Sequence, residues 1–388
     1  MDRLYADRVD TEELLALLVR RFKGAEADGQ GNVFYPSSQD CAIRIHVVAR
    51  HIVELEFGSA FGKSQIEGLR RQVREKLLAD RGSQVERRIA FCSMPVAGHF
   101  VAPNDAFHLL PAPAEAPRPP AFFGDHPLVI EFPVKSSVDE WVTFDRTART
   151  FAQWTWFLNA ILLDTFLTPR TRQGWFLSVD RADPNAQIEV RWGNEGYTIP
   201  GKTLEPPGSF SPLVGPPLNV QAQDEYYSRR GVSVRDTLSV PDSFAGDISA
   251  FVALDAPQRD RLLRCAQWIT AAHDLWGSHM SSWYIAQVAA VETLAHADGS
   301  PDRNRQPTKR FKDFLEMYAP GSGSRNDRKR LYAVRSRLVH GTAMLDHDSP
   351  FGGGLLAFAT HERESMDRLS RAVTIASVNW LREQAAAP

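Results

Sequence analysis

Cysteine is scarce in this sequence. Its 388 residues include only Cys41, Cys92 and Cys265, and no two of them form a CxxC pair. An odd number of widely spaced cysteines argues against both a disulfide framework and a zinc knuckle. We therefore expect free and mostly buried thiols, as is typical of a reducing cytoplasm, and no bound metal.

Long apolar runs and a strong net charge are also missing. The first residues, MDRLYADRVD, mix charged and apolar side chains and lack the apolar centre of a signal peptide. The most apolar later stretch, Phe151–Leu167, is interrupted by Gln153, Asn159 and Asp164 and is too short to cross a bilayer, so it predicts a buried helix. The net charge of -2 gives no general attraction to membranes or nucleic acid. These features predict a soluble cytoplasmic protein with no membrane partner.

Several catalytic signatures are absent, among them G-x-S-x-G and H-E-x-x-H. The segment Gly58–Ser64, GSAFGKS, resembles a phosphate-binding loop, but the position that requires the first glycine is occupied by Phe57. A turn followed by a helix cap is the favoured interpretation, with a nucleotide site as the alternative. We expect no cofactor, and we interpret His273 and His279 as single histidines without a metal.

The chain is long enough for two domains. Up to residue 240 both kinds of periodicity occur, which predicts an α+β domain. We expect helices over 11–22, 65–79 and 148–167, strands over 42–57, 88–94, 106–110, 127–134, 174–179 and 187–192, and loops over 111–120 and 196–224.

From about residue 242 the pattern becomes helical, with one weak strand signal at Leu355–Ala359. This change predicts an α+β domain over 1–240, followed by an all-α helical-bundle domain over 241–388. The helices are expected over 243–254, 257–276, 281–297, 309–319, 325–341 and 362–384.

The segment Leu331–Gly341, LYAVRSRLVHG, is the candidate functional site. An arginine followed five positions later by a histidine, as in Arg335 and His340, is expected about once by chance in such a chain. The context adds weight, because the pair lies in an amphipathic helix that Gly341 ends. His340 thus falls in the last turn, where the negative end of the helix dipole favours a protonated imidazole suited to acid–base chemistry.

Helix geometry constrains how these residues work together. Positions five apart are separated by roughly 140° around the axis, so Arg335 and His340 do not share a face. Ser336 and His340, four apart, do. Arg335 must therefore reach around the helix or meet a histidine from a second subunit, and a homodimer would pool both pairs in one cleft.

The surroundings of this segment are basic. Residues 301–340 contain 11 Lys and Arg against four acids, a local charge of 11 − 4 = +7 in a chain of net charge -2. Such a stretch is typical of phosphate contacts, and a merely solvated helix face is the alternative. The candidate RNA-binding residues are Lys309, Arg310, Lys312, Arg328, Lys329, Arg330 and Arg337.

At these residues the chain resembles the HEPN superfamily, and within it the Apea-like group, whose motif is R-x(4–6)-H near the end of a late helix. Arg335 to His340 fits this motif, and SSWYIAQVAAVETLAHA and KRFKDFLEMYA resemble the earlier helices of the group. The likeness covers about 242–385. One position departs from the wider pattern, since Ser336 stands where Asn, Asp or His is frequent.

The resemblance implies a metal-independent endoribonuclease. The RNA 2′-OH would attack the adjacent phosphate and leave a 2′,3′-cyclic phosphate, with His340 as the acid–base group and Arg335 on the phosphate. It also implies a toxin or antiviral role with the N-terminal domain as sensor or regulator. Two alternatives are a non-catalytic HEPN module that binds RNA or nucleotide or dimerises, and an enzymatic N-terminal domain with the helices as scaffold.

Overall fold

The structure is a computed structural model. It describes residues 3–5, 9–22, 26–27, 33–35, 42–48, 51–77, 82–112, 126–137, 139–168, 174–178, 189–193, 208–213, 215–229, 236–276, 278–296, 307–348 and 360–386. The chain forms two compact units: unit 1 is Met1–Glu86 with Pro133–Thr150, and unit 2 is Arg87–Phe132 with Phe151–Pro388. This division by contacts differs from the predicted boundary near residue 240, because the later helices share unit 2 with an earlier sheet.

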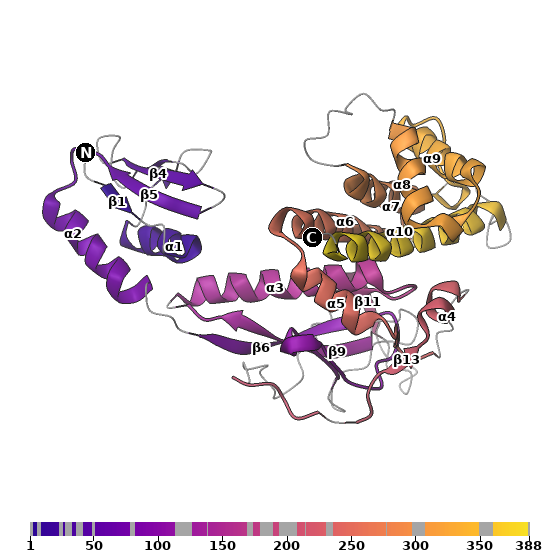
Figure 1. The fold of residues 1–388 in the computed structure, drawn as a ribbon, viewed down its shortest axis with the longest axis horizontal. Helices are drawn as coiled ribbons and strands as arrows, with labels where there is room; N and C mark the ends of the chain where they lie inside the picture. The colour runs from indigo at the N-terminus through magenta and orange to yellow at the C-terminus, as the bar shows by residue number, and fades with distance from the viewer. Residues whose placement is uncertain are drawn as a thin grey trace. The chain divides into compact units, whose positions relative to one another are not determined.

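Unit 1 contains a sheet of five antiparallel strands in the order β1-β5-β4-β3-β2, of which β1, β4 and β5 are labelled in Figure 1. The region 42–57 forms two of these strands, and the register between them shifts after His46. Alternation in β4 places Ile43 and Ile45 on the buried face and Arg44 on the exposed face. The strands are β1 (Arg3–Tyr5), β2 (Glu26–Ala27), β3 (Val33–Tyr35), β4 (Ile43–Val48) and β5 (His51–Phe57).

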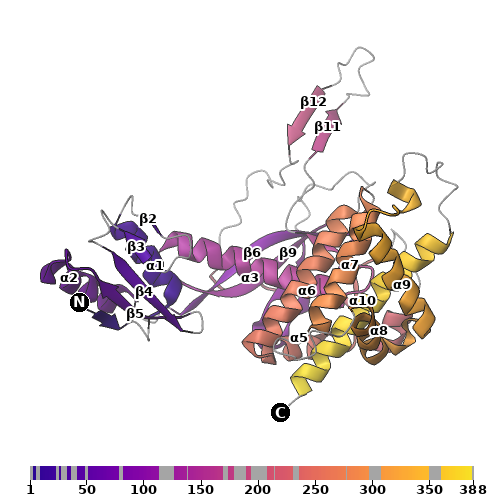
Figure 2. The same cartoon turned by 90° about the horizontal axis from the view of Figure 1, so that it is seen from above.

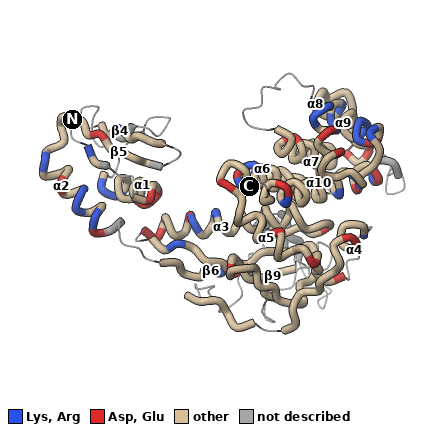
Figure 3. The backbone as a smooth tube through the Cα atoms, viewed as in Figure 1, with Lys and Arg blue, Asp and Glu red and all other residues tan. Residues whose placement is uncertain are grey.

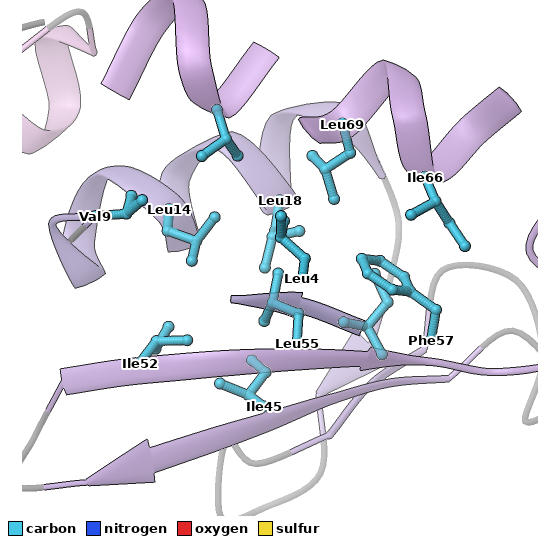
Figure 4. Close-up of a cluster of buried hydrophobic side chains, with 12 residues drawn as sticks. Leu4, Val9, Leu14, Leu18, Ile45, Ile52, Leu55, Phe57, Ile66 and Leu69 are labelled. Atoms are coloured by element: carbon cyan, nitrogen blue, oxygen red, sulfur yellow. The ribbon is translucent and has the colours of Figure 1, made fainter. Parts of the chain in front are cut away.

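Two helices cover the apolar face of this sheet. They are α1 (Thr11–Arg21) and α2 (Lys63–Gln72), the second continuing into the π-helical turn η2 (Val73–Leu77). Leu14 and Leu18 of α1 and Leu69 of α2 meet Leu55 of the sheet, and each is at most 1% exposed (Figure 4). Burial of each such side chain contributes about 1.5–3 kcal/mol, so this cluster is the core of unit 1.

The segment Gly58–Ser64 forms the turn and helix start that were predicted. The Gly62 amide, at the N-cap of α2, donates to Oε1 of Gln65 over 3.0 Å. The Gly58 amide donates to the carbonyl of Ala42 at 2.8 Å. These two bonds account for the backbone of the segment as a turn that leaves the sheet and enters a capped helix.

The first turns of α3 (Glu140–Ile161) are joined to α1 by one buried arginine. The guanidinium of Arg146 lies 2.9 Å from Asp10, 3.0 Å from Glu12 and 3.2 Å from Glu13. It also donates to the carbonyl of Lys135 at 3.3 Å. Three carboxylates and a carbonyl surround one cation, which ties three segments of unit 1 together.

Unit 2 contains a second five-stranded sheet in the order β10-β6-β9-β8-β7. Strands predicted over 88–94, 106–110 and 127–134 lie in it, and the later turns of α3 pack on it through Trp154, whose ring centroid is 4.7 Å from that of Phe107. The strands are β6 (Ser83–Cys92), β7 (Phe100–Val101), β8 (His108–Pro111), β9 (His126–Lys135) and β10 (Leu167–Thr168). Short connections include η3 (Pro103–Asp105).

Two small strand pairs complete the β structure of the described residues. The antiparallel pair β11 (Gly174–Ser178) and β12 (Glu189–Gly193) confirms the strands predicted over 174–179 and 187–192. The parallel pair β13 (Asn219–Gln221) and β14 (Ser239–Pro241) flanks α4 (Gln223–Ser228). The end of the predicted loop 196–224 therefore contains a strand.

The C-terminal region of unit 2 is helical, as predicted, whereas the earlier part of the chain mixes helices and strands. Helix α7 packs against four neighbours, α6, α8, α9 and α10 (Figure 2). Its buried side chains include Trp283 and Tyr284, both at most 1% exposed. The helices are α5 (Phe244–Ala253), α6 (Ala256–Leu275), α7 (Met280–Ala295), α8 (Pro307–Tyr318), α9 (Arg325–Val339) and α10 (Thr360–Ala386), with η4 (Pro320–Ser322) and η5 (Asp346–Asp348) between them. The weak strand signal at Leu355–Ala359 lies outside the described residues.

Two further expectations concern burial. Cys92 and Cys265 are buried free thiols, and burial raises the pKa of each to about 12, while Cys41 lies outside the described residues. The second half of α3 is buried, with Phe157 and Leu158 fully inaccessible. Within the described part of the chain, no helix combines the length and apolarity that a membrane span requires.

Candidate functional site

Helix α9 contains the Arg335–His340 segment and is capped at both ends. At its start, the Ser324 hydroxyl accepts from the Asp327 amide at 3.2 Å, and the Ser324 amide donates to the Asp327 carboxylate at 2.9 Å. At its end, His340 is the C-cap residue and Gly341 has a φ of 68°. The position of the helix end predicted from the sequence is therefore confirmed.

The turn after α9 is a Schellman motif. The Gly341 amide donates to the Leu338 carbonyl at 3.1 Å, and the Thr342 amide donates to the Arg337 carbonyl at 3.0 Å. Both bonds satisfy carbonyls that the helix itself leaves open. Because the left-handed conformation at Gly341 suits glycine, the sequence fixes this turn, and with it the direction in which the chain leaves His340.

His340 is exposed at this helix end, beside the partial negative charge of the last carbonyls. The hydrogen bond that joins it to Ser336 runs between backbone atoms, from the His340 amide to the Ser336 carbonyl, over 3.1 Å. The Ser336 side chain is half-buried. The imidazole therefore faces solvent from a backbone position that is fixed.

Arg335 lies against α7. Its Nη2 atom is 3.2 Å from Oε2 of Glu292, and its guanidinium carbon lies 5.5 Å from the ring centroid of Tyr332. The Tyr332 hydroxyl donates to the other carboxylate oxygen of Glu292 at 2.8 Å. Burial and the Glu292 carboxylate together raise the pKa of Tyr332 to about 12. Arg335 thus belongs to a small network between two helices.

This network separates Arg335 from His340, as the spacing of five predicts. The Arg335 side chain is 26% exposed and directed to α7, whereas His340 is on the exposed side of α9. Among the hydrogen bonds of the described residues, none joins the two side chains. Within one chain the two residues are close in sequence without forming a contact pair.

Glu292 and Tyr332 are the residues that sequence analysis did not assign to the site. A signal for Glu292 is present, since it is the one charged residue in the helix MSSWYIAQVAAVETLA. A carboxylate that is only 23% exposed, on a helix packed within the bundle, is expected to have a polar partner. That partner is Arg335, together with the hydroxyl of Tyr332.

The candidate RNA-binding residues lie on α8 and α9, where Figure 3 marks Lys and Arg positions in blue along the backbone, and most of them are exposed. Lys309, Lys329, Arg330 and Arg337 are exposed. Lys312 and Arg310 are half-buried, and Nη1 of Arg310 is 3.3 Å from Nδ1 of His296.

Arg328 corrects the prediction. It is 4% exposed, and its Nη2 atom donates to the carbonyls of Ala319 and Pro320, at 3.4 Å and 2.8 Å. Periodicity explains the difference, because position 328 lies on the same buried side of α9 as Leu331 and Tyr332. Arg328 therefore satisfies the backbone at the end of α8 rather than offering its charge to a phosphate.

The chain that follows His340 is tied to the start of α7. The Asp348 carboxylate accepts from the amides of Met280 at 2.9 Å and Ser281 at 2.5 Å. The Leu345 amide donates to the Ser281 hydroxyl at 3.0 Å. Burial alone would raise the pKa of Asp348, but the hydrogen bonds from Ser281 and Met280 outweigh it and lower the pKa. These contacts hold the end of α9 at a fixed place in the bundle.

Among the described residues, no group of three or more His, Cys, Asp or Glu side chains is arranged so that it could hold a metal ion. Comparison of the chain with protein-family models, with curated proteins and with solved structures found no match. The functional argument therefore depends on the residues themselves.

Proposed function

We propose that the helical region binds RNA along α9 and cleaves it at His340 without a metal ion, as a HEPN-like endoribonuclease. The observation that supports this most is the exposed His340 at a capped helix end, on the same side of α9 as a row of cations. At 100° per residue, Lys329 lies within about 20° of His340 around the axis, and Arg337 within about 60°. Lys329 and Arg337 form no ion pair with another described residue.

An RNA strand whose phosphates contact Lys329 and Arg337 would also place a phosphate beside the imidazole of His340. The RNA 2′-OH is the nucleophile, and His340 exchanges a proton with the attacking or the leaving oxygen, which typically accelerates a reaction 10²–10⁴-fold. The products are a 2′,3′-cyclic phosphate and a 5′-OH end. DNA lacks the 2′-OH and is not cleaved.

Arg335 would neutralise the phosphate in the transition state. Because its guanidinium lies against Glu292, on a different side of α9 from His340, we propose that the working site combines His340 of one chain with Arg335 of a second copy. A twofold pairing through the helical domain would create two such sites. A monomer that retains full activity, shown by light scattering at the assay concentration, would exclude this arrangement.

Cleavage of an unstructured RNA in excess EDTA tests the proposal. We expect His340→Ala and Arg335→Ala each to reduce the cleavage rate by about 10²-fold or more, since each removes a separate contribution to the transition state. His347→Ala is the matched control, an exposed histidine seven positions later. RNA cleavage by His340→Ala at the rate of the parent protein would refute the proposed role of His340.

A second candidate is a non-catalytic module that binds RNA or nucleotide or dimerises. The observation that favours it is the pairing of Arg335 with Glu292 and Tyr332, which serves the packing of α9 on α7. Protein that shifts RNA in a gel, yet leaves it intact under every condition, would support this candidate over the enzyme. In either case a toxin or antiviral role remains an extension of the proposal.

A further inference from the structure

Arg310 and His296 form a pair where α7 ends and α8 begins. His296 is the C-cap residue of α7 and is exposed, while Arg310 is half-buried in the first turn of α8. Nη1 of Arg310 lies 3.3 Å from Nδ1 of His296. A guanidinium has donors only, so Nδ1 is the acceptor of this bond. The proton of the neutral imidazole is therefore on Nε2, which makes no hydrogen bond with a described residue.

The guanidinium of Arg310 has further donors that are not in use. Its Nε and Nη2 atoms form no hydrogen bond, and its charge forms no ion pair, with another residue in the described part of the chain. Nε and Nη2 lie on one edge of the planar group, and arginine uses such an edge to bind two oxygen atoms of a ligand. Together with Nε2 of His296, the pair therefore presents three hydrogen-bond donors and one positive charge.

Glu292 lies one helical turn before His296, on the same face of α7, but its carboxylate already has partners. Its two oxygens bind the Tyr332 hydroxyl at 2.8 Å and Nη2 of Arg335 at 3.2 Å. Arg310 lies near this network too, because its charge, like that of Arg335, opposes the rise in the pKa of Tyr332 that burial causes. One carboxylate thus lies beside two guanidinium groups, which leaves an excess of positive charge at this end of α7.

These donors and this charge indicate what binds there. The ligand must supply several acceptor oxygens and a negative charge, which is the chemistry of a phosphate group. Two lysines of α8, Lys309 and Lys312, are three residues apart and therefore neighbours on the helix surface. Neither forms an ion pair with another described residue. A strand with several phosphates can use this run of cations, whereas a single free phosphate cannot.

We propose that Arg310 and His296 together bind one phosphate of the RNA strand, next to Arg335. This inference rests on the proposed RNA-binding function and adds His296, which lies outside the R-x(4–6)-H motif, to the residues that hold the strand. Arg310 supplies the attraction, and the Nε2 donor of His296 fixes where the phosphate lies. Because a phosphate contact carries no information about the base, the pair adds affinity without sequence preference.

Fluorescence anisotropy with a short labelled single-stranded RNA tests this phosphate site. Methylation of every 2′-OH prevents cleavage, so that binding is measured alone. We expect Arg310→Ala to raise the Kd by roughly 10- to 100-fold, because it removes charge-assisted hydrogen bonds. His296→Ala, which removes one neutral donor, should raise it by roughly 2- to 10-fold. If both residues hold the same phosphate, the double variant should lose less affinity than the product of the two single effects.

Two matched controls separate the site from general effects of losing a basic side chain. Arg325→Ala removes an exposed arginine of α9 whose charge is already paired with Asp313 at 3.3 Å and Glu316 at 3.5 Å. His279→Ala removes an exposed histidine at the opposite end of α7. Both controls should bind the RNA within about twofold of the parent protein, because neither offers a free donor beside Arg310.

Two conservative variants test the geometry. His296→Gln keeps an acceptor for Arg310 and an N–H donor, so it should recover most of the affinity. Arg310→Lys keeps the charge, and with it the slope of log affinity against log salt concentration, but it lacks the planar edge and should still show a raised Kd. Circular dichroism and thermal unfolding establish that every variant folds.

The outcomes are distinguishable. If Arg310→Ala and His296→Ala bind RNA as tightly as the two controls do, or if their effects multiply in the double variant, the phosphate site is wrong whether or not the protein cleaves RNA. If inorganic phosphate binds the parent protein but not Arg310→Ala, and both bind RNA equally, the site takes a free phosphate and the proposal is overturned. If the parent protein binds but does not cleave unmethylated RNA, the nuclease proposal fails while the losses in the two variants still support the phosphate site. A parent protein that binds no single-stranded RNA overturns both.

Discussion

Arg146 in unit 1 and Arg335 in unit 2 are both arginines held by acidic side chains, but their surroundings differ. Arg146 is enclosed by Asp10, Glu12, Glu13 and a backbone carbonyl, and its side chain is 9% exposed. Arg335 has one carboxylate and one aromatic ring beside it and is 26% exposed. Nε and Nη1 of Arg146 donate to Glu12, Glu13 and the Lys135 carbonyl, and its Nη2 lies 2.9 Å from Asp10. Of the Arg335 guanidinium, Nη2 contacts Glu292, and Nε is buried without a hydrogen-bond partner among the described residues.

The comparison contrasts a fully enclosed arginine with a partly exposed one. Five donors in a fixed plane need several acceptors, and a site that supplies them leaves nothing for a ligand. Arg328 extends the comparison to α9 itself: seven residues before Arg335, it is 4% exposed and its Nη2 donates to two backbone carbonyls. Positive charge in the sequence therefore does not equal positive charge on the surface.

Loss of Arg146 should have the largest effect on stability. Arg146→Ala leaves Asp10, Glu12 and Glu13 close together without their cation, and we expect unfolding of unit 1 to become easier by about 3–5 kcal/mol. Urea denaturation followed by circular dichroism measures this. Arg149→Ala is the control, because Arg149 is 50% exposed and its pairs with Glu12 and Asp145 should contribute under about 1 kcal/mol. Equal costs for the two variants would contradict the structural role given to Arg146.

Arg328 and its neighbour Lys329 should separate stability from RNA binding. Arg328→Leu leaves the Pro320 carbonyl without the guanidinium donor, while the Ala319 carbonyl keeps its bonds from Ser322. We expect a loss of about 1–3 kcal/mol in unfolding free energy. Lys329→Ala should change stability by less than about 0.5 kcal/mol. If Lys329 contacts a phosphate, the same substitution should reduce the slope of log RNA affinity against log salt concentration by about 1. The opposite result, with Arg328→Leu stable and Lys329→Ala unfolded, would show that Arg328 does not lie on the buried side of α9.

The sequence predicted the elements better than it predicted which charges are available. Apolar periodicity located α1, α9 and the later helices, and Gly341 marked the end of α9, because both signals are local. Arg328 was assigned to the surface because its residue type is usually exposed, although its phase on α9 matches Leu331 and Tyr332. The prediction for Arg328 counted basic residues along the sequence without considering which side of the helix each one occupies.

Glu292 and the two compact units were harder to predict for a different reason. The pairing of Glu292 with Arg335 joins residues 43 positions apart, and no local pattern encodes which helix face meets which. The division of the chain has the same origin, since unit 1 includes Pro133–Thr150 from beyond the segment 87–132. Packing between distant segments determines both the Glu292–Arg335 pair and the division into units. The periodicity of a single sequence does not predict such packing.

The smallest predicted effect concerns Asp348, whose carboxylate fixes the chain after α9. Its pKa lies below the usual 3.8 in the folded protein, so the stabilisation is complete above that pH and is lost as the pH falls through the folded pKa. Asp348→Asn keeps one acceptor oxygen but loses the second hydrogen bond and the negative charge at the start of α7. We expect it to cost about 1 kcal/mol at pH 7, and the difference from the parent protein to shrink at pH 3. Urea denaturation at pH 7, 5 and 3 measures it. Asp346→Asn is the control, an exposed carboxyl two residues earlier that should show little difference at any of these pH values. A gap between Asp348→Asn and the parent that stays constant from pH 7 to pH 3 would mean that the charge of Asp348 does not hold α7 and the end of α9 together.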